Sequence, residues 1–520
     1  MSLRARCLGG SRLLQGLGAA MLLLVLFVPP VQGQERDLLS QFEEKVTTFS
    51  LDNGLTFVVV ERDESPVVSF HTYADVGSVN EPAGRTGLAH MFEHMAFKGT
   101  TTIGTDNIEE ERAALRRQEE AYLEWRRERA KGPQADSARI DSLRQVFEEA
   151  QAEAESHMDE GEYENILERE GVSGMNAYTS ADATGYMYSL PANKLELFFA
   201  MESDRFLNPV LREFYTERDV VMEERRQRTE SNPTGRLIEE FLTTAYKAHP
   251  YGQPTIGHMS DLRNLSRTDA KAFYEKYYTA GNLTIGIAGD VDPAEVRALA
   301  EEYFGALPAG EDPLPVTTEE PEQQGERRVI LREQTQPYVV VGYHRGSMQS
   351  EDDPVYDVLA NVLGQGRTSR LYRRLVESET ALNVQAIPGF PGEKHESLFV
   401  LFALPNRGVA PDTVEQALYD ELDRIQEEGI TQEELERAQT QARASLVGNL
   451  DSNSGLARQL SRMQALTGDW RGIFRQLEAL EAVTVEDVQR VARNTFERSN
   501  RTVGLIKSAD DEDAPTADAN

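Results

Sequence analysis

Two histidines and a glutamate lie within five consecutive residues of this chain, at His90, Glu93 and His94. On a helix, residues four apart share one face, so both imidazoles can reach a single metal ion. Imidazole nitrogens are common zinc ligands, and zinc lowers the pKa of a bound water toward 7. Glu93 is one residue from one ligand and three from the other, so its carboxylate can accept a proton from that water. The order His-x-x-Glu-His is an inverted zinc-binding motif.

The alternative for this motif is a pair of core histidines on an apolar helix face. Such a core would bury Glu93 without a partner that offsets its loss of hydration. The chain contains only eight histidines, so two of them beside one acid are informative. We therefore predict a zinc site on this segment, with Glu93 as the catalytic base.

A catalytic zinc ion usually has three protein ligands, and its fourth position is left for water. Glu217 and Glu224 are two helical turns apart in a stretch of helical character, so their carboxylates point the same way. One carboxylate could complete the site and the other could support it by hydrogen bonding. Spacing alone does not separate this arrangement from a solvated acidic helix face.

Composition limits the classes of partner. The chain has 520 residues, which favours two or more domains, and a net charge of −34. Phosphate binding needs a basic surface, so nucleic acid is not expected as a partner. Beyond the N-terminus, no segment reaches the roughly 18 apolar residues of a membrane span, so no stable membrane insertion is expected. The single cysteine, Cys7, leaves the exported chain without disulfides.

The first 33 residues have the composition of a secretory signal. They begin with three arginines, continue into the apolar run 21–28, and end in small residues at 31–33. We predict cleavage before Gln34 and export to the periplasm or beyond the cell. An uncleaved N-terminal anchor is the alternative.

The remaining chain reads as two similar halves. Strand-like runs at 56–60 and 66–73 precede a helix, and a run at 337–343 also precedes one. Each half closes with another strand, at 283–289 and 502–506. This order predicts two homologous α+β domains, each with a mainly antiparallel sheet and helices packed on one face. The predicted segments are a catalytic domain at 45–306, a linker at 307–327, a second domain at 328–508 and an acidic tail at 509–520. A chance likeness between the halves is the alternative.

A charged segment interrupts the first half, from about residue 105 to about residue 161. Apolar residues recur in it at helical spacing, and Gly132 and Pro133 break the run. We predict an inserted antiparallel hairpin of two amphipathic helices. A solvated decoration without function is the alternative.

From about Thr47 to Lys507, the chain resembles the pitrilysin/insulinase family of zinc metallopeptidases. The zinc helix at 87–95 matches that family in residue order, and so do the flanking residues 97–100. The resemblance implies one zinc ion per chain and the following roles: metal ligands His90, His94 and Glu224; catalytic base Glu93; supporting acid Glu217. It further implies that Asn176 and Ala177 lie on an edge strand that pairs with the backbone of a peptide substrate.

Two departures from the family bear on this interpretation. The interval between His94 and Glu224 exceeds the usual one, which the predicted hairpin explains. Many members also carry an arginine and a tyrosine that steady the substrate carbonyl, where this chain has Val376 and Asn383. We therefore predict that a related subunit without the zinc motif supplies that pair, and a homodimer is the alternative assembly. This chain then resembles the zinc-bearing type of subunit.

The function predicted from the sequence is a zinc-dependent metallo-endopeptidase that acts on peptides or unfolded polypeptides. One alternative is a catalytically inactive member of the family that works as a structural or peptide-binding subunit. Another is a zinc-binding chaperone or receptor that holds peptides without hydrolysing them.

Overall fold

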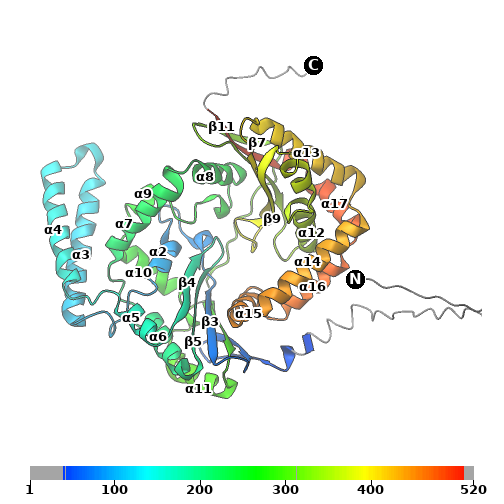
Figure 1. Cartoon of the computed structure of the whole chain (residues 1–520). Coiled ribbons are helices and arrows are strands. Elements are labelled where there is room, and N and C mark those ends of the chain that lie inside the picture. The colour runs from blue at the N-terminus through cyan, green and yellow to red at the C-terminus, as the bar shows by residue number, and fades with distance from the viewer. Residues whose placement is uncertain (1–38, 41, 312, 509–520) are drawn as a thin grey trace, which may run out of the picture. The chain divides into compact units, whose positions relative to one another are not determined.

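The computed structural model describes residues 39, 40, 42–311 and 313–508 (Figure 1). The predicted signal segment 1–33 and the predicted acidic tail 509–520 lie outside the described residues. The described residues from Lys45 to Ser508 form one unit.

A six-stranded sheet forms the first half of this unit, in the order β1-β2-β6-β3-β5-β4. Neighbouring strands pair antiparallel, except that β2 and β6 run parallel. The strands are β1 (Val46–Ser50), β2 (Thr56–Glu61), β3 (Val67–Ala74), β4 (Ser173–Thr179), β5 (Thr184–Pro191) and β6 (Leu283–Gly289).

A five-stranded sheet forms the second half, in the order β7-β11-β8-β10-β9. Only β7 and β11 run parallel in it. The strands are β7 (Arg327–Glu333), β8 (Tyr338–Arg345), β9 (Ala381–Phe390), β10 (Ser397–Pro405) and β11 (Arg501–Ser508). From β2 to β4 the first sheet has the same order and sense as the second, so the predicted pair of homologous, mainly antiparallel domains is confirmed.

Helices alternate with strands along each half. In the first half they are α2 (Leu88–Met95), α3 (Ile108–Arg129), α4 (Ser137–Glu155), α5 (Glu162–Arg169), α6 (Leu195–Leu207), α7 (Phe214–Arg225), α8 (Pro233–Ala245), α9 (Met259–Leu262), α10 (Arg267–Tyr277) and α11 (Pro293–Phe304). In the second half they are α12 (Asp353–Gly364), α13 (Pro411–Glu428), α14 (Gln432–Leu450), α15 (Asn453–Thr467), α16 (Gly472–Ala482) and α17 (Val485–Thr495).

Each sheet buries one face against helices of its own half, as predicted. In the first half, aromatic side chains fill this layer, and Phe70 of β3 stacks on Phe198 of α6 with ring centroids 3.8 Å apart. In the second half, Val339 and Val341 of β8 join a core with α12, α13 and α17. Burial of these apolar surfaces is the main favourable contribution to the stability of both layers.

The opposite face of each sheet packs against a helix from the other half, which the sequence did not predict. Helix α15 lies on β2, β3 and β6, where Gly286 faces Ala457 and His71 Nδ1 is 2.7 Å from Ser461 Oγ. Helix α8 lies on β7, β8 and β11, where Phe241 packs over Gly342. This exchange of helices joins the two halves into one unit.

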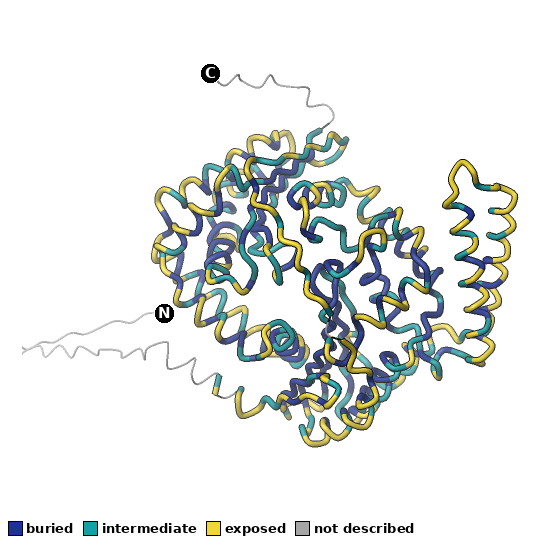
Figure 2. Tube along the Cα trace, turned by 180° about the vertical axis from the view of Figure 1, so that it is seen from behind, coloured by how far each residue is buried: buried dark blue, intermediate teal, exposed yellow. Residues whose placement is uncertain are grey.

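The charged insertion folds as the predicted helical hairpin. Helices α3 and α4 pack against each other, and the chain turns between them at Gly132–Gln134. The hairpin projects beside α7 and its outer side is largely exposed (Figures 1 and 2). Aromatic residues close its inner side, with Trp125 stacked on Phe147 at 5.8 Å between ring centroids.

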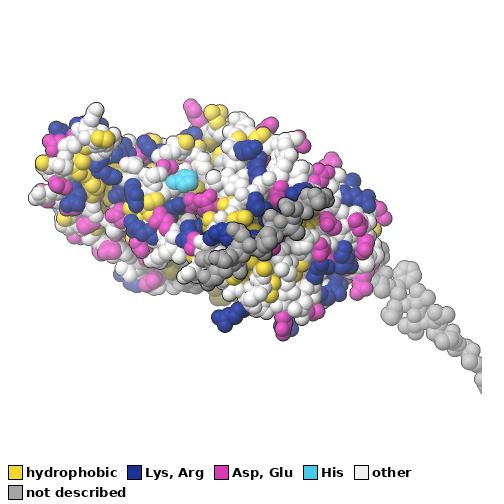
Figure 3. All heavy atoms as spheres, turned by 90° about the horizontal axis from the view of Figure 1, so that it is seen from above, with side chains coloured by type: hydrophobic (Ala, Val, Ile, Leu, Met, Phe, Trp, Pro, Cys, Tyr) yellow, Lys and Arg dark blue, Asp and Glu magenta, His cyan; other side chains and the backbone are white. Residues whose placement is uncertain are grey.

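Between α11 and β7, the described residues 305–311 and 313–326 form no helix or strand. The domain boundaries that we predicted around this linker stay predictions. In the described part of the chain, no helix combines the length and the apolar character that crossing a bilayer demands. Acidic and basic side chains are interspersed over the described part of the face shown in Figure 3.

The close contact at Gly286 predicts that a methyl group there will disturb the exchange of helices. A Cβ atom at this position would lie 2.1 Å from the carbonyl oxygen of Ala457. We expect Gly286→Ala to lower the free energy of unfolding by about 1–3 kcal/mol, as overpacking typically does. Thermal melting measures the effect. Gly448→Ala in α14 is the matched control, because a Cβ there meets nothing within 4 Å. Equal melting temperatures for the two variants would contradict the prediction.

Candidate metal centre

Helix α2 carries the histidine pair, and its start is fixed by one buried acid. Glu81 accepts hydrogen bonds from the backbone N–H groups of Gly87 and Ala89, both at 2.7 Å. These bonds satisfy donors that an N-terminus otherwise leaves free. Gly87 is in the left-handed region at φ 92°, and a Cβ there would lie 2.9 Å from the carbonyl oxygen of Ile256. Only glycine fits this close approach without strain.

The apolar side of α2 locks the helix into the first core. Leu88, Met91 and Phe92 are buried there, and Phe92 packs on Phe273 with ring centroids 6.0 Å apart. Their helical spacing leaves His90 and His94 together on the side that faces α7. The two imidazole rings meet edge to face, with centroids 4.9 Å apart.

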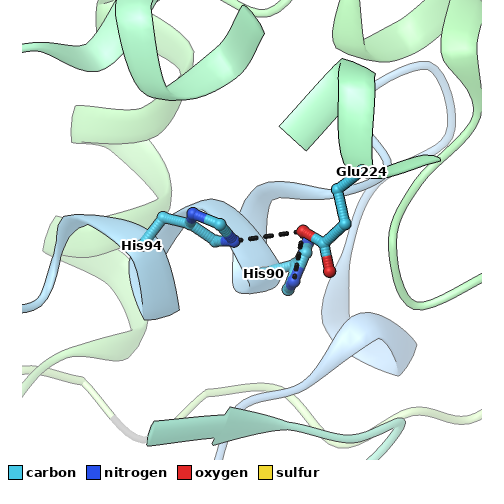
Figure 4. Close-up of side chains that lie close together, drawn as sticks. All are labelled: His90, His94 and Glu224. Atoms are coloured by element: carbon cyan, nitrogen blue, oxygen red, sulfur yellow. Dashed lines mark ion pairs between the residues drawn. The ribbon is translucent and has the colours of Figure 1, made fainter. Parts of the chain in front are cut away.

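Helix α7 brings Glu224 to the two histidines (Figure 4). Glu224 Oε2 lies 3.3 Å from His94 Nε2 and 3.7 Å from His90 Nε2. One ligand atom from each of the three residues falls within 4.8 Å of the others. The structure therefore brings the three predicted metal ligands together from two helices that are far apart in the chain.

The spacing of these atoms suits a zinc ion. Zinc bonds of about 2.1 Å in a tetrahedral arrangement separate neighbouring ligand atoms by about 3.4 Å. Glu224 Oε2 is also buried without a hydrogen-bond donor among the described residues. A buried carboxylate oxygen in that state is unfavourable unless a cation neutralises it. Two imidazole nitrogens and one carboxylate oxygen are a donor set typical of zinc.

Glu217 lies behind His94, where the sequence placed a supporting acid. Its Oε2 is 3.3 Å from His94 Nδ1, and its Oε1 is 2.6 Å from Lys98 Nζ. The hydrogen bond to Glu217 raises the pKa of His94, although burial acts in the opposite direction. Burial acts to raise the pKa of Glu217, but the hydrogen bonds from His94 and Lys98 outweigh it and lower that pKa. Glu217 is thus held as a carboxylate that fixes the orientation of the His94 ring.

His90 has a different environment. Its side chain is 8% exposed, and burial lowers its pKa, so the ring is held neutral, as a metal ligand must be. Its Nδ1 is buried and has no hydrogen-bond partner in the described part of the chain. The usual carboxylate or carbonyl support of a ligating histidine is therefore present at His94 and missing at His90.

Glu93 is partly exposed on α2, between the two histidines. Its carboxylate makes no hydrogen bond or ion pair with any described residue. Its carboxylate is therefore free to act on a molecule that enters the site.

The predicted substrate residues lie on the edge strand next to α2. Strand β4 is the outermost strand of the first sheet, and α2 packs against it. Asn176 is exposed and Ala177 is half-buried. An open strand edge beside a metal centre can accept an extended peptide as a further strand.

The positions of the family's arginine and tyrosine lie in the second half. Val376 is half-buried at the end of the π-helical turn Tyr372–Val376, and Asn383 is exposed on β9, the edge of the second sheet. Neither side chain offers a cation or a phenol to the centre.

Sequence reasoning missed two cations at the site. Lys98 pairs with Glu217, and Arg228 Nη1 lies 2.6 Å from Glu224 Oε1. A basic residue four positions after an acid is a signal of such a pair on a helix, and it could have pointed to Arg228.

The inserted hairpin reaches the site through α7. Tyr215 donates a hydrogen bond to Glu119 of α3 at 2.6 Å, and its ring packs on Tyr122 and Phe147. The guanidinium of Arg218 lies over both tyrosine rings. The hairpin therefore covers one side of α7, while Glu217 and Glu224 project from another.

Comparison with known families gives two matches. The model described as insulinase (peptidase family M16) matches residues 57–127 and 152–258. The model described as the peptidase M16 inactive domain matches residues 264–442. The gap at 128–151 contains most of α4, in keeping with an insertion at the hairpin.

Relatives with similar sequences span most of the chain. The zinc protease PqqE of Helicobacter pylori is 29% identical over 501 residues, covering 94% of this chain and 98% of the relative. An uncharacterized zinc protease of Mycobacterium leprae is 27% identical over 464 residues, covering 86% of this chain and 89% of the relative.

Solved structures share the fold. A protease from Helicobacter pylori matches with a TM-score of 0.74 at 26% identity, covering 89% of this chain and 99% of that chain. The periplasmic protease PqqL from Escherichia coli matches with a TM-score of 0.63 at 19% identity, covering 89% of this chain and 47% of that chain.

Glu81, the buried acid that accepts hydrogen bonds from the start of α2, should make the stability of the protein depend on pH. Burial raises the pKa of Glu81 to about 8, from an ordinary value of 4.5. Between these values the folded chain keeps a proton that the unfolded chain has lost, so stability falls as pH rises from 5 to 8. Glu81→Gln removes this titration. We expect the melting temperature of the variant, relative to the parent protein, to be higher at pH 8 than at pH 5.

Glu109→Gln is the control, because Glu109 is exposed in the first turn of α3. The difference in melting temperature between Glu109→Gln and the parent protein should stay constant over the same pH range. A Glu81→Gln difference that also stays constant would show that Glu81 is ionised in the folded protein throughout.

Proposed function

The chain belongs to the insulinase family of peptidases (peptidase family M16), and from this premise we propose that it is a zinc-dependent metallo-endopeptidase. The observation that carries the proposal is the convergence of His90 Nε2, His94 Nε2 and Glu224 Oε2 beside the free carboxylate of Glu93. Its substrates are peptides or unfolded polypeptides.

The metal ligands in this proposal are His90, His94 and Glu224, with one zinc ion per chain. A zinc ion held there would supply Lewis-acid chemistry for water activation and for polarising the carbonyl of the peptide bond. Glu217 keeps Nδ1 of His94 hydrogen-bonded, so that Nε2 of the ring stays directed at the metal position.

Glu93 is the general base and then the general acid in this mechanism. Its carboxylate first accepts a proton from the attacking water and later passes that proton to the leaving amine nitrogen. Among the described residues the carboxylate has no hydrogen-bond or ion-pair partner that would have to be displaced, and it lies one residue before a metal ligand. Both features suit a group that exchanges protons in every turnover.

Substrate binding in this proposal uses the edge of β4. An extended peptide would pair with the main chain around Asn176 and Ala177, with its backbone beside α2. Main-chain pairing depends little on side chains, so the proposal includes broad sequence tolerance. Folded proteins do not offer such a free strand, which favours unfolded substrates.

Two alternatives use the same architecture without hydrolysis. An inactive member of the family would serve as a structural or peptide-binding subunit, and a chaperone or receptor would hold peptides beside a bound metal. The description of one matched segment as an inactive domain concerns residues 264–442, which lie outside the proposed metal site. The buried Oε2 of Glu224, which faces both imidazoles and has no hydrogen-bond donor among the described residues, favours the metalloenzyme over both alternatives.

The proposal extends to a partner and a location. Val376 and Asn383 cannot act as the family's arginine and tyrosine, so a related subunit without the zinc motif would supply them. A homodimer is the alternative assembly, and it would work without this pair. Export to the periplasm or beyond the cell rests on the signal-like composition of residues 1–33.

Glu93→Gln should abolish turnover and leave zinc bound. The amide keeps the size of the side chain but cannot accept the water proton, so we expect kcat to fall by about 10²–10⁴. Peptide cleavage is measured with the related subunit present, because the chain alone is expected to have little activity, and metal content is measured on the same preparation. Glu223→Gln, an equal change beside Glu224, should stay near parental activity. Cleavage by Glu93→Gln at the parental rate would reject Glu93 as the base.

The partner proposal predicts that the purified chain alone has little activity. Adding a related subunit that carries the arginine and tyrosine should raise peptide cleavage at least about tenfold, since losing one oxyanion donor typically costs 10²–10³ in kcat. Light scattering reports the assembly. A mixture made with Glu93→Gln should stay inactive, which assigns the cleavage to this chain. Full activity of the isolated monomer would refute the need for a partner.

A further inference from the structure

The two oxygens of Glu224 have different surroundings. Oε2 is buried and faces the imidazoles of His90 and His94. Oε1 lies 2.6 Å from Nη1 of Arg228, whose side chain is 73% exposed. One carboxylate therefore has a metal-facing oxygen and an oxygen already paired with a cation.

The backbone that carries Arg228 is unusual and firmly held. Residues Arg226–Glu230 form a π-helical turn directly after α7. Such turns are rare and occur often at functional sites. The carbonyl oxygen of Arg228 packs against Gly235 of α8, where a Cβ atom would come within 2.0 Å of it. The turn closes with a hydrogen bond from Ser231 N to Arg226 O at 2.7 Å.

A carboxylate ligand can present either oxygen, or both, to a metal ion. A cation fixed at one oxygen leaves the other as the ligand and stops the group from rotating. We propose that Arg228 is a positioning residue that holds Oε1 of Glu224, so that Oε2 alone is directed at the position between the two histidines. The inference rests on the proposed zinc site and adds a residue to it.

If charge repulsion alone mattered, replacing Arg228 would change the zinc affinity in the opposite direction. A guanidinium near a metal cation repels it, so removing that charge should strengthen metal binding if charge were all that mattered. A positioning role predicts weaker binding, because Glu224 loses the contact that orients it. The direction of the change therefore separates the two explanations.

The neighbouring arginine provides a matched control. Arg226 begins the same turn and lies 2.8 Å from Glu223, an acid that does not face the histidines. Its side chain is 44% exposed. Arg226→Gln removes the same charge from the same turn and breaks a comparable ion pair, but it leaves Glu224 untouched.

The experiment measures the zinc affinity of the full chain by competition with a chelator, for the parent protein, Arg228→Gln, Arg228→Lys and Arg226→Gln. We expect Arg228→Gln to weaken zinc binding by about 10-fold to 100-fold, as the loss of a ligand's supporting contact typically does. The zinc affinity of Arg228→Lys should lie between those of the parent protein and Arg228→Gln, because an ammonium keeps the charge but not the planar geometry. Arg226→Gln should bind zinc like the parent protein. Melting of the metal-free proteins checks that all four are folded.

Unchanged or tighter zinc binding by Arg228→Gln, with a parent protein that binds zinc, would overturn the positioning role and leave the proposed function intact. Equal weakening in both glutamine variants would also overturn it, because a general effect of charge or of the turn would then suffice. A folded parent protein that fails to bind zinc would overturn both the proposed function and this inference.

Discussion

The constraint on which this structure depends is the meeting of three metal-binding atoms from two separate helices. Histidine nitrogens come from α2 and a carboxylate oxygen from α7, and these helices are more than a hundred residues apart. An oxygen buried without a donor costs free energy in every folded molecule. The surroundings of α2 and α7 must therefore hold these atoms together against that cost until a cation offsets it.

Both helices are fixed from the sides that do not face the centre. Glu81 and the close packing of Gly87 on Gly257 set the start of α2, and aromatic residues of the first core hold its apolar side. Helix α7 is covered by the inserted hairpin through Tyr215 and Arg218. An insertion that lengthens the chain between the ligands thus packs against the helix that delivers the third one.

The two halves are joined by more than the linker between them. Helices α15 and α8 each lie on the sheet of the opposite half, at glycines that allow close approach. Near the end of the edge strand β4, Asp182 accepts hydrogen bonds from the backbone N–H groups of Glu393 and Lys394. Lys394 also pairs with Asp75 at the end of β3. The strand proposed to bind substrate is therefore anchored by the second half, although all three predicted metal ligands lie in the first.

Features that depend on local spacing could be predicted from the order of the residues alone. Side chains four apart share a helix face, so His90 and His94 could be paired without coordinates, and the same periodicity predicted the hairpin. Runs of β-branched residues predicted the repeated strands. For Glu224, spacing alone favoured a solvated acidic helix face, and a family resemblance was needed to identify it as a ligand. Its contact with the histidines, the hold of Arg228 on its second oxygen and the exchange of α8 and α15 came only from the tertiary structure. Local periodicity fixes which residues point the same way, whereas the choice of which faces meet is made by packing between segments far apart in the chain.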